Sequence, residues 1–232
     1  MAAAVHLQVR MREAHMGRQT PHADHSEGDE QLLVARSQRG DVPAFNQLVE
    51  RYQDSAYGLA LRMLGDPELA ADVTQDAFVS AFRAVERFRG GSFRAWLLRI
   101  VSNACYDQWR AARRRPTMSL ELVAGDDHGE AAHQEPHDSF IDDRWNPEAT
   151  ALRGELIELI SRALLQLPPE QRLAVVLSDV QGLAYDEIAE VMQTSLGTVK
   201  SRIARGRSHL RDLLRTHPEL LPSRYRRASE MG

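Results

Sequence analysis

Cysteine is almost absent from this chain of 232 residues, in which Cys105 is the only one. A single cysteine excludes a disulfide framework within the chain and suits a reducing compartment. No apolar run reaches the roughly twenty residues that a membrane-spanning helix needs, and the first 29 residues lack the apolar core of a signal peptide. We therefore expect a cytoplasmic protein that does not insert into membranes.

Motifs of catalysis are missing as well. The sequence contains no phosphate-binding glycine loop, no spacing typical of zinc ligands and no recognisable Ser/His/Asp set. His128, His133 and His137 lie among acidic residues and are the candidate set for a metal hydrolase, but a long polar segment without periodicity rarely preorganises a metal site. We expect no enzyme activity, no metal and no cofactor.

A charge of one sign does not dominate, because the formal net charge is only -4. The charge is unevenly spread: the segment from Glu121 to Glu148 holds nine acids against the single base Arg144, whereas residues 113–115 and 200–215 are basic. Local charge decides what a surface binds, so the acidic average does not exclude a nucleic-acid partner.

Apolar residues recur at helical spacing in two parts of the chain, and no strand pattern interrupts them. We predict an all-α protein of two small helical domains, at residues 30–115 and 153–216, joined by a flexible acidic linker at 116–152. Residues 1–29 are predicted to be a disordered N-terminal extension and 217–232 a C-terminal tail. After a first helix from Glu30, we expect one helix from Pro43 to Tyr52 and a further one through Ala56 and Met63.

Near the C-terminus, residues 184–214 predict two helices joined by a short turn at Gln193–Gly197, the second helix being longer and basic. This arrangement is typical of a DNA-reading helix-turn-helix. Opposite an apolar face, the second helix carries small hydroxyls and cations, which suit phosphates and major-groove base edges. A solvated basic face is the simpler alternative, and we favour duplex DNA. The candidate contacts on this helix are Thr198, Lys200, Ser201, Ala204 and Arg205.

The helix predicted over 95–113 follows a glycine loop at 88–93 and has one polar side. A stripe of polar residues recurs there at spacings of four, four and three: Arg99, Asn103, Asp107 and Arg110. Cations that follow a backbone, amides that recognise base edges and nearby aromatics, here Phe93 and Trp96, suit a single-stranded nucleic acid. A polar surface closed by core aromatics is the alternative, which the residues alone slightly favour.

A third surface is acidic. The helix expected from Pro67 to Phe88 presents Asp72, Gln75 and Asp76 next to Phe78. Such a patch suits docking on a basic partner, but acids in the first turns of a helix also stabilise its dipole. The residues leave the two explanations even.

Four motifs, in this order, resemble a bacterial RNA polymerase sigma factor of the extracytoplasmic function (ECF) group, over roughly residues 30–216. They are Asp72-Val-Thr-Gln-Asp-Ala-Phe78, Phe88-Arg-Gly-Gly-Ser-Phe-Arg-Ala-Trp-Leu-Leu-Arg-Ile-Val-Ser-Asn103, Leu167-Pro-Pro-Glu-Gln-Arg172 and Gly197-Thr-Val-Lys-Ser-Arg202. The resemblance implies a sigma-2 domain, a sigma-4 domain, promoter DNA and core RNA polymerase as partners, and an anti-sigma factor. It also implies that the acidic linker threads through polymerase.

The resemblance further implies roles for individual residues. Contacts to polymerase would come from Asp72, Gln75, Asp76 and Phe78. Capture and melting of the minus-10 element would involve Arg89, Ser92, Phe93, Trp96, Arg99, Asn103, Asp107 and Arg110. Contacts to the minus-35 element would come from Arg172, Tyr185, Thr198, Lys200, Ser201, Arg202, Ala204 and Arg205.

Ala184 departs from the resemblance, since the family often has a Ser there, and the loss of that cap costs about 1 kcal/mol. The alternative function is a stand-alone helix-turn-helix regulator, whose first domain would dimerise or sense a ligand. That alternative requires tight binding to duplex DNA without polymerase.

Overall fold

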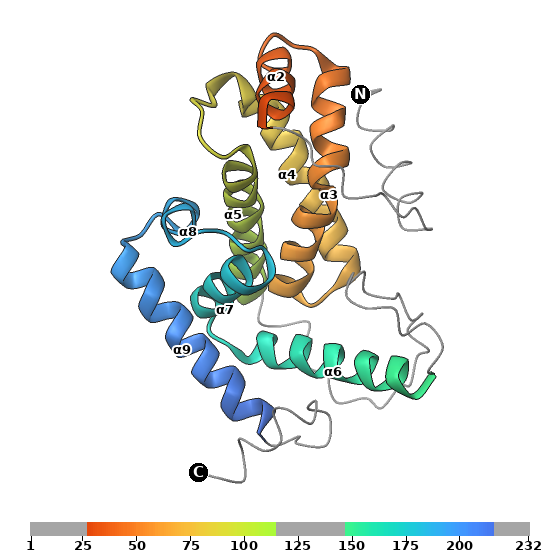
Figure 1. Cartoon of the computed structure of the whole chain (residues 1–232), viewed down its shortest axis with the longest axis vertical. Coiled ribbons are helices and arrows are strands. Elements are labelled where there is room, and N and C mark those ends of the chain that lie inside the picture. Colours follow the sequence, from red (N-terminus) through yellow and green to blue (C-terminus); the bar gives the residue numbers. More distant parts are fainter. Residues whose placement is uncertain (1–26, 115–146, 216–232) are drawn as a thin grey trace.

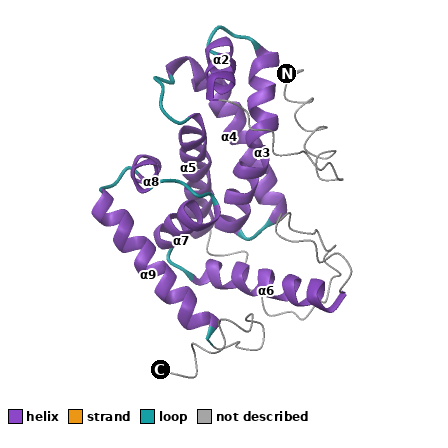
Figure 2. Cartoon of the chain, viewed as in Figure 1, coloured by secondary structure: helices purple, strands orange, loops and turns teal. Residues whose placement is uncertain are grey.

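The computed structural model describes residues 27–114 and 147–215 (Figure 1). Every regular element of these residues is helical (Figure 2), so the predicted all-α class is confirmed. The first domain contains α2 (Glu27–Ser37), α3 (Val42–Leu64), α4 (Pro67–Ala84), the 3-10 turn η1 (Val85–Arg87) and α5 (Phe93–Arg114). The second contains α6 (Pro147–Gln166), α7 (Pro169–Val175), the π-helical turn η2 (Val176–Val180), α8 (Tyr185–Met192) and α9 (Leu196–Leu214).

Helix α3 is one continuous helix, and the prediction of two helices in this stretch was wrong. Its buried residues follow one another at spacings of three and four without a break: Phe45, Leu48, Tyr52, Ala56, Leu59 and Met63. No proline interrupts the helix after its first turn, so nothing in the backbone opposes continuation. Gly65 ends α3 in the left-handed conformation, at φ 76°, and its amide donates to the Leu61 carbonyl at 2.8 Å.

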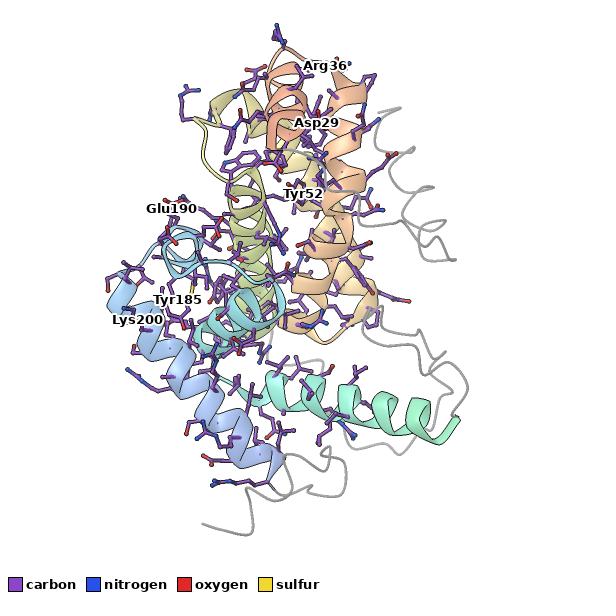
Figure 3. The ribbon with its side chains drawn as sticks, in the orientation of Figure 1. Asp29, Arg36, Tyr52, Tyr185, Glu190 and Lys200 are labelled. Carbon is purple, nitrogen blue, oxygen red and sulfur yellow. The ribbon has the colours of Figure 1, made fainter. Side chains whose placement is uncertain are left out.

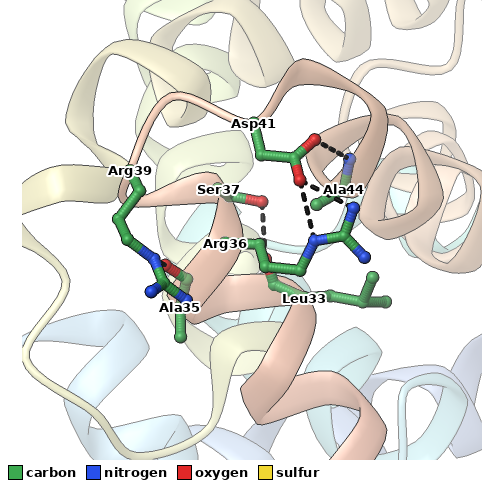
Figure 4. A network of polar contacts seen from close by, with 7 residues as sticks. All are labelled: Leu33, Ala35, Arg36, Ser37, Arg39, Asp41 and Ala44. Carbon is green, nitrogen blue, oxygen red and sulfur yellow. Dashed lines mark hydrogen bonds and ion pairs between the residues drawn. The ribbon is translucent and has the colours of Figure 1, made fainter.

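A polar network fixes the corner between α2 and α3 (Figure 4). Asp41 caps α3 by accepting from the Ala44 amide at 3.1 Å, and it also accepts from the Arg36 guanidinium at 2.7 Å. The hydrogen bond from the Ala44 amide and then the Arg36 contact lower the pKa of Asp41. Ser37 donates back to the Leu33 carbonyl at 2.7 Å, so the end of α2 is held as well.

Two helices begin earlier than the sequence predicts. Helix α2 starts at Glu27, inside the predicted extension, and α6 starts at Pro147, inside the predicted linker. Proline in a first helical turn loses no hydrogen bond, which suits the start of α6. Residues 116–146 of the predicted linker, with its three histidines, lie outside the described residues, as do residues 1–26 and 216–232. The other predicted domain boundaries stay a prediction.

Each domain packs in its own way. In the first, large side chains fill the space between α3, α4 and α5, and Phe78 and Phe93 are each 1% exposed. In the second, α9 lies against α7 through Gly206, where an added Cβ would come within 2.6 Å of Val175 Cγ2. Burial of apolar area stabilises both domains. The close packing of α9 on α7 also requires that Gly206 has no side chain.

The two domains also pack against each other. In Figure 1, α6 crosses the lower end of α3, and α8 lies beside α5. We call this contact the seam: α3 and α5 on one side, and α6, α7, η2 and α8 on the other. Apolar residues of both domains form one continuous buried cluster across it. The sequence had left the relative placement of the domains open.

Candidate nucleic-acid interface

Helix α9 turns a basic surface to solvent. Val199 and Ile203 are buried and fix which side of the helix faces the core. The opposite side, which we call the α9 arc, consists of the exposed residues Lys200, Ala204, Arg205, Ser208 and Arg211. Figure 3 shows α9 with the Lys200 side chain. Flexible cations around a small alanine leave room for a groove edge of duplex DNA.

Hydroxyl groups organise the leading turn of α9. Ser195 caps the helix by accepting from the Thr198 amide at 3.2 Å, and its Oγ lies 2.9 Å from Thr198 Oγ1. Ser201 is half-buried and donates to the Thr198 carbonyl at 2.9 Å. The oxygen of Ser201 keeps lone pairs free as acceptors, whereas its proton is already used within the helix.

Arg202 lies on the flank of α9 rather than on the arc. Its guanidinium pairs with Glu170 of α7, and its side chain is only 21% exposed. At 100° per residue, the side chain of Arg202 points about 160° away from that of Ala204 around the helix axis. Arg202 therefore lies at the edge of the buried side of α9. The predicted contact of Arg202 with the minus-35 element stays a prediction, and in this structure Glu170 engages its guanidinium.

Tyr185 opens α8 and is exposed at the edge of the helix-turn-helix (Figure 3). Ala184, just before it, has no capping oxygen, but Glu187 accepts from the Ala184 amide at 3.0 Å. Half of a capping box therefore survives the missing serine.

Arg207 is a residue that the sequence analysis missed. Its Nε donates to Asp179 at 3.0 Å and thereby ties α9 to the end of η2. Burial raises the pKa of Asp179, but the hydrogen bonds from Arg207 and Ser178 outweigh burial, so the pKa is lowered overall. Helical spacing predicts that Arg207 lies on the flank opposite Arg202, but it does not predict that Asp179 is the partner of Arg207.

Arg172 does not lie near a DNA surface. The side chain is 7% exposed and donates to three carbonyl oxygens, those of Met63, Leu165 and Leu167. Burial lowers the pKa of Arg172. This corrects its predicted role, because a guanidinium enclosed by three carbonyls of the protein has no access to phosphate.

The stripe on α5 is partly engaged. Asn103 is exposed, and Asp107 pairs with Arg110 at 3.1 Å. Arg99 donates to the side-chain oxygen of Gln193, which lies 3.2 Å from its Nε, with the Gln193 amide oriented accordingly. In this structure, the end of α8 therefore lies against Arg99, at the N-terminal end of the stripe.

The glycine loop before α5 is open, but its aromatics are not. Gly90 and Gly91 adopt φ values of 96° and 87°, and added Cβ atoms would meet nothing within 4 Å. Ser92 caps α5 by accepting from the Ala95 amide at 3.1 Å.

The side chains in and after this loop differ in how far they are exposed to solvent. Arg89 is exposed and donates to the Glu86 carbonyl at 3.0 Å. Phe93 is 1% exposed, and Trp96 is half-buried with its ring 5.3 Å from that of Phe93. Phe93 belongs to the core, which corrects its predicted contact with a base; Trp96 keeps one partly open face.

The acidic surface of α4 presents Asp72 and Asp76 to solvent, with Gln75 half-buried. Phe78 is 1% exposed, so its predicted contact with polymerase is not available. Phe82 is the exposed aromatic on this side, at 37%, and its ring rests on Phe45 with centroids 5.0 Å apart. The sequence analysis missed it, although Phe82 follows Gln75 by seven residues and so shares its face.

Comparisons with known families settle what these surfaces belong to. Residues 48–115 match the family model of Sigma-70 region 2, and residues 157–210 match Sigma-70, region 4. The RNA polymerase sigma-H factor of Pseudomonas aeruginosa is 41% identical over 179 residues, which cover 77% of this chain and 90% of that relative. This chain belongs to the ECF sigma factors of the sigma-70 family.

Further relatives and structures agree. The ECF RNA polymerase sigma-E factor of Escherichia coli is 38% identical to this sigma factor over 180 residues, 77% of this chain and 90% of the relative. CnrH in complex with the cytosolic domain of CnrY is similar in structure, with a TM-score of 0.57 and 28% identity over 82% of this chain and 99% of that one. RpoE in complex with the anti-sigma factor NepR from Bartonella quintana has a TM-score of 0.56 and 25% identity, covering 75% and 98%.

The predicted identity is thus confirmed, and a sigma factor of transcription initiation is favoured over the stand-alone regulator. Within residues 27–114 and 147–215, no helix of the sigma factor has the length and apolarity to cross a bilayer. The same residues contain no group of three metal-ligating side chains.

Proposed function

We propose that this sigma factor binds core RNA polymerase and directs initiation at specific promoters, with α9 on the minus-35 duplex and α5 on the melted minus-10 strand. The single observation that carries this proposal is the solvent-facing α9 arc, capped by Ser195 and backed by buried Val199 and Ile203. The proposed role is that of an initiation factor in the cytoplasm without catalytic activity of its own.

At the minus-35 element, Lys200 and Arg205 are the proposed principal contacts. Both are exposed on the α9 arc, and Ala204 between them leaves space for a thymine methyl or a base edge. Thr198 and Ser201 add acceptors near the helix start, and Tyr185 contacts the backbone. Arg202 and Arg172 act differently in this proposal: they position α9 and α7 through Glu170 and the Met63 carbonyl.

At the minus-10 element, Asn103 is the proposed reader of a base edge, with Trp96 as the partly open aromatic surface. Extracting a base costs a few kcal/mol of stacking, which edge contacts and stacking in the protein must offset. Arg89, Ser92, Arg99 and Arg110 are proposed to contact the strand near the loop and along the helix. Asp107 pairs with Arg110 at 3.1 Å and is assigned to orienting it.

On polymerase, the proposed docking surface is α4. Asp72, Gln75 and Asp76 supply acidic and polar groups for a basic partner, and Phe82 supplies the exposed aromatic. Aromatic residues are enriched among the anchors of protein interfaces. Phe78 supports this surface from the core beneath it.

An anti-sigma factor is also a proposed partner. Support comes from the two similar structures, CnrH in complex with the cytosolic domain of CnrY and the sigma factor RpoE in complex with the anti-sigma factor NepR. Both similarities cover more than two thirds of this chain.

The test is transcription from a cognate promoter with purified core polymerase and the full-length protein. We expect Asn103→Ala to lower open-complex formation, measured by permanganate reactivity, while binding to the minus-35 duplex persists. Gln166→Ala, an exposed change on α6 outside the proposed DNA and polymerase surfaces, is the matched control. Failure to bind core polymerase at micromolar concentration would refute the proposal, and unchanged opening in Asn103→Ala would remove its minus-10 assignment.

A further inference from the structure

We propose that the first domain carries a further nucleic-acid surface, an arginine patch that binds the phosphates of the melted strand on the 3′ side of its minus-10 sequence. The patch consists of four exposed side chains: Arg39, Arg83, Arg87 and Arg89. This inference rests on the proposed function, because it extends the path of the strand that α5 is proposed to hold. Only Arg89 already has a role in that function.

Three segments of the chain meet at the arginine patch. Gln38, in the turn after α2, donates from Nε2 to the Phe88 carbonyl at 2.8 Å and to the Val85 carbonyl at 3.3 Å. This one amide holds the corner before α3 against η1 and the start of the glycine loop. Arg39 directly follows Gln38, and Arg87 directly precedes Phe88. In Figure 1, α2 and the loop after η1 accordingly lie at the same end of the domain.

The arginine patch keeps its positive charge. Arg36, at the same corner, pairs with Asp41 and is therefore not counted in the patch (Figure 4). Arg39 donates instead to a backbone carbonyl of α2 at 3.1 Å, a neutral partner. Residues 83–91 hold three arginines against one acid, Glu86. A local excess of positive charge on an exposed surface attracts a polyanion.

The arginine patch continues the proposed minus-10 surface. Asn103 lies eleven residues along the chain from Ser92, which corresponds to about 16 Å of helix. Beyond Ser92, Gly90 and Gly91 leave the loop open, since added Cβ atoms there would meet nothing within 4 Å. A strand that follows α5 from Asn103 toward the start of the helix therefore reaches the loop and then the patch.

The direction of the strand follows from the order of the domains. The C-terminal end of α5 leads along the chain to the second domain, which is proposed to hold the upstream minus-35 duplex. The loop end of α5 is therefore the downstream end of the first domain. On the strand that carries the minus-10 sequence, downstream is the 3′ side.

Arginine suits phosphate in particular. Its guanidinium is planar, always charged and able to donate two parallel hydrogen bonds to phosphate oxygens. Phosphate contacts position a strand without recognising its sequence. The patch would thus guide the strand toward the start site whatever its bases. A merely solvated charged surface predicts instead that binding does not depend on how far the strand extends.

The test uses the full-length sigma factor bound to core polymerase. The probes are fluorescein-labelled single strands: one that ends at the minus-10 sequence of a cognate promoter, and two that add six nucleotides of mixed sequence at the 3′ or the 5′ end. A fourth strand has uncharged methylphosphonate linkages in its 3′ addition. Fluorescence anisotropy over a salt series measures the affinity of each strand.

Two variants reduce the charge of the patch, Arg87→Gln and the double variant Arg39→Gln with Arg87→Gln. Arg83 is left unchanged because it borders the α4 surface proposed for polymerase. Arg162→Gln, an exposed change on α6, removes one positive charge elsewhere and is the matched control for Arg87→Gln. The same core polymerase is present throughout, so differences between variants report on the sigma factor.

We expect the 3′ addition to raise wild-type affinity about tenfold at low salt and to steepen the salt dependence by about 0.7 for each phosphate contacted. Arg87→Gln should lose part of this gain, and the double variant most of it. The methylphosphonate addition and the 5′ addition should give little gain. Affinity for the short strand should stay within twofold in every variant, and Arg162→Gln should behave as the wild type.

The outcomes separate the two proposals. An equal gain from the 3′ addition in the wild type and the double variant would overturn the arginine patch, even where transcription proceeds normally. A gain that survives the methylphosphonate linkages would overturn the phosphate contact, and an equal gain from the 5′ addition would overturn its placement. Failure of the wild type to bind core polymerase or the short strand would instead refute the proposed function.

Discussion

The two surfaces proposed for DNA differ in what lies over them. On α9, the buried side packs on α7 and the arc with Lys200 and Arg205 faces solvent. On α5, one side packs on α3 and α4, and the polar stripe meets α8, with Arg99 on Gln193. Similar helical amphipathicity therefore has two outcomes in one chain.

This difference teaches that one end of a polar stripe can serve as a contact between domains while the rest of the stripe faces solvent. The α9 arc ends a layered packing and has no further element above it among the described residues. On the α5 stripe, Arg99 meets Gln193 across the seam, whereas Asn103, Asp107 and Arg110 stay exposed. The following predictions test how far the two surfaces differ, from the largest expected effect to the smallest.

Phe93→Ala should be the most damaging change, because it removes a buried ring from the core beneath the α5 stripe. We expect the free energy of unfolding to fall by about 3–5 kcal/mol, measured by urea denaturation. Phe82→Ala is the control, since that ring is exposed and should cost far less stability while weakening polymerase binding. A stable Phe93→Ala that fails only in promoter opening would restore Phe93 to the DNA surface.

Gly206→Ala should disturb α9 in particular, because the new Cβ would lie 2.6 Å from Val175 Cγ2 and 3.3 Å from the Gln171 carbonyl. Overpacking of this kind costs about 1–3 kcal/mol. Gly197→Ala has no atom but Ser195 Oγ within 4 Å and is the matched control. Thermal unfolding should show the loss; equal stability of the two variants would contradict a close approach of α9 to α7.

Arg205→Ala should weaken binding of the minus-35 duplex by about 1–3 kcal/mol, as expected for one arginine contact to a base. Stability should stay unchanged, because the side chain is exposed. Arg202→Ala is the comparison on the same helix: it loses the pair with Glu170 and should affect duplex binding less. Fluorescence anisotropy over a salt series measures both, and a larger loss for Arg202→Ala would place the DNA contact on the flank.

Asp179→Asn should have the smallest effect, at most about 1 kcal/mol for an exposed ion pair. The pKa of Asp179 is lowered, so its stabilising contribution is present above the ordinary value of 3.8 and disappears as pH falls through the folded value. The stability difference from wild type should thus be constant near neutral pH and vanish in acid. Asp54→Asn, at an exposed position of α3, is the control; a difference that persists at pH 2 would exclude the Asp179 carboxylate as its source.

Much of the fold followed from local sequence signals. The caps and breaks at Asp41, Gly65 and Ser195 lie where polar side chains and glycine predict them. The exposure of Lys200 and Arg205 followed from helical periodicity around Val199. The false break in α3 arose because Asp54 and Ser55 resemble a loop locally, although apolar spacing runs through them.

Candidate residues on motifs were harder to place. Arg172, Phe78 and Phe93 each lie in a motif with functional neighbours, yet all three are buried. A motif gives the positions that matter and does not separate a residue that touches a ligand from one that supports the contact. The sequence analysis assigned no role to Phe82 or Arg207, because the position of each side chain depends on a neighbour from another helix. Phe82 rests on Phe45, and Arg207 pairs with Asp179.

The sequence by itself determined the helices, the helix-turn-helix, the basic side of α9 and the family, because periodicity, caps and motifs are properties of neighbouring residues. Only the tertiary structure decided that Gln181 meets Ser55 and Arg94, that Arg172 faces Met63, and that α8 covers Arg99. These contacts join residues more than 80 positions apart, and their geometry depends on how two separately folded cores meet.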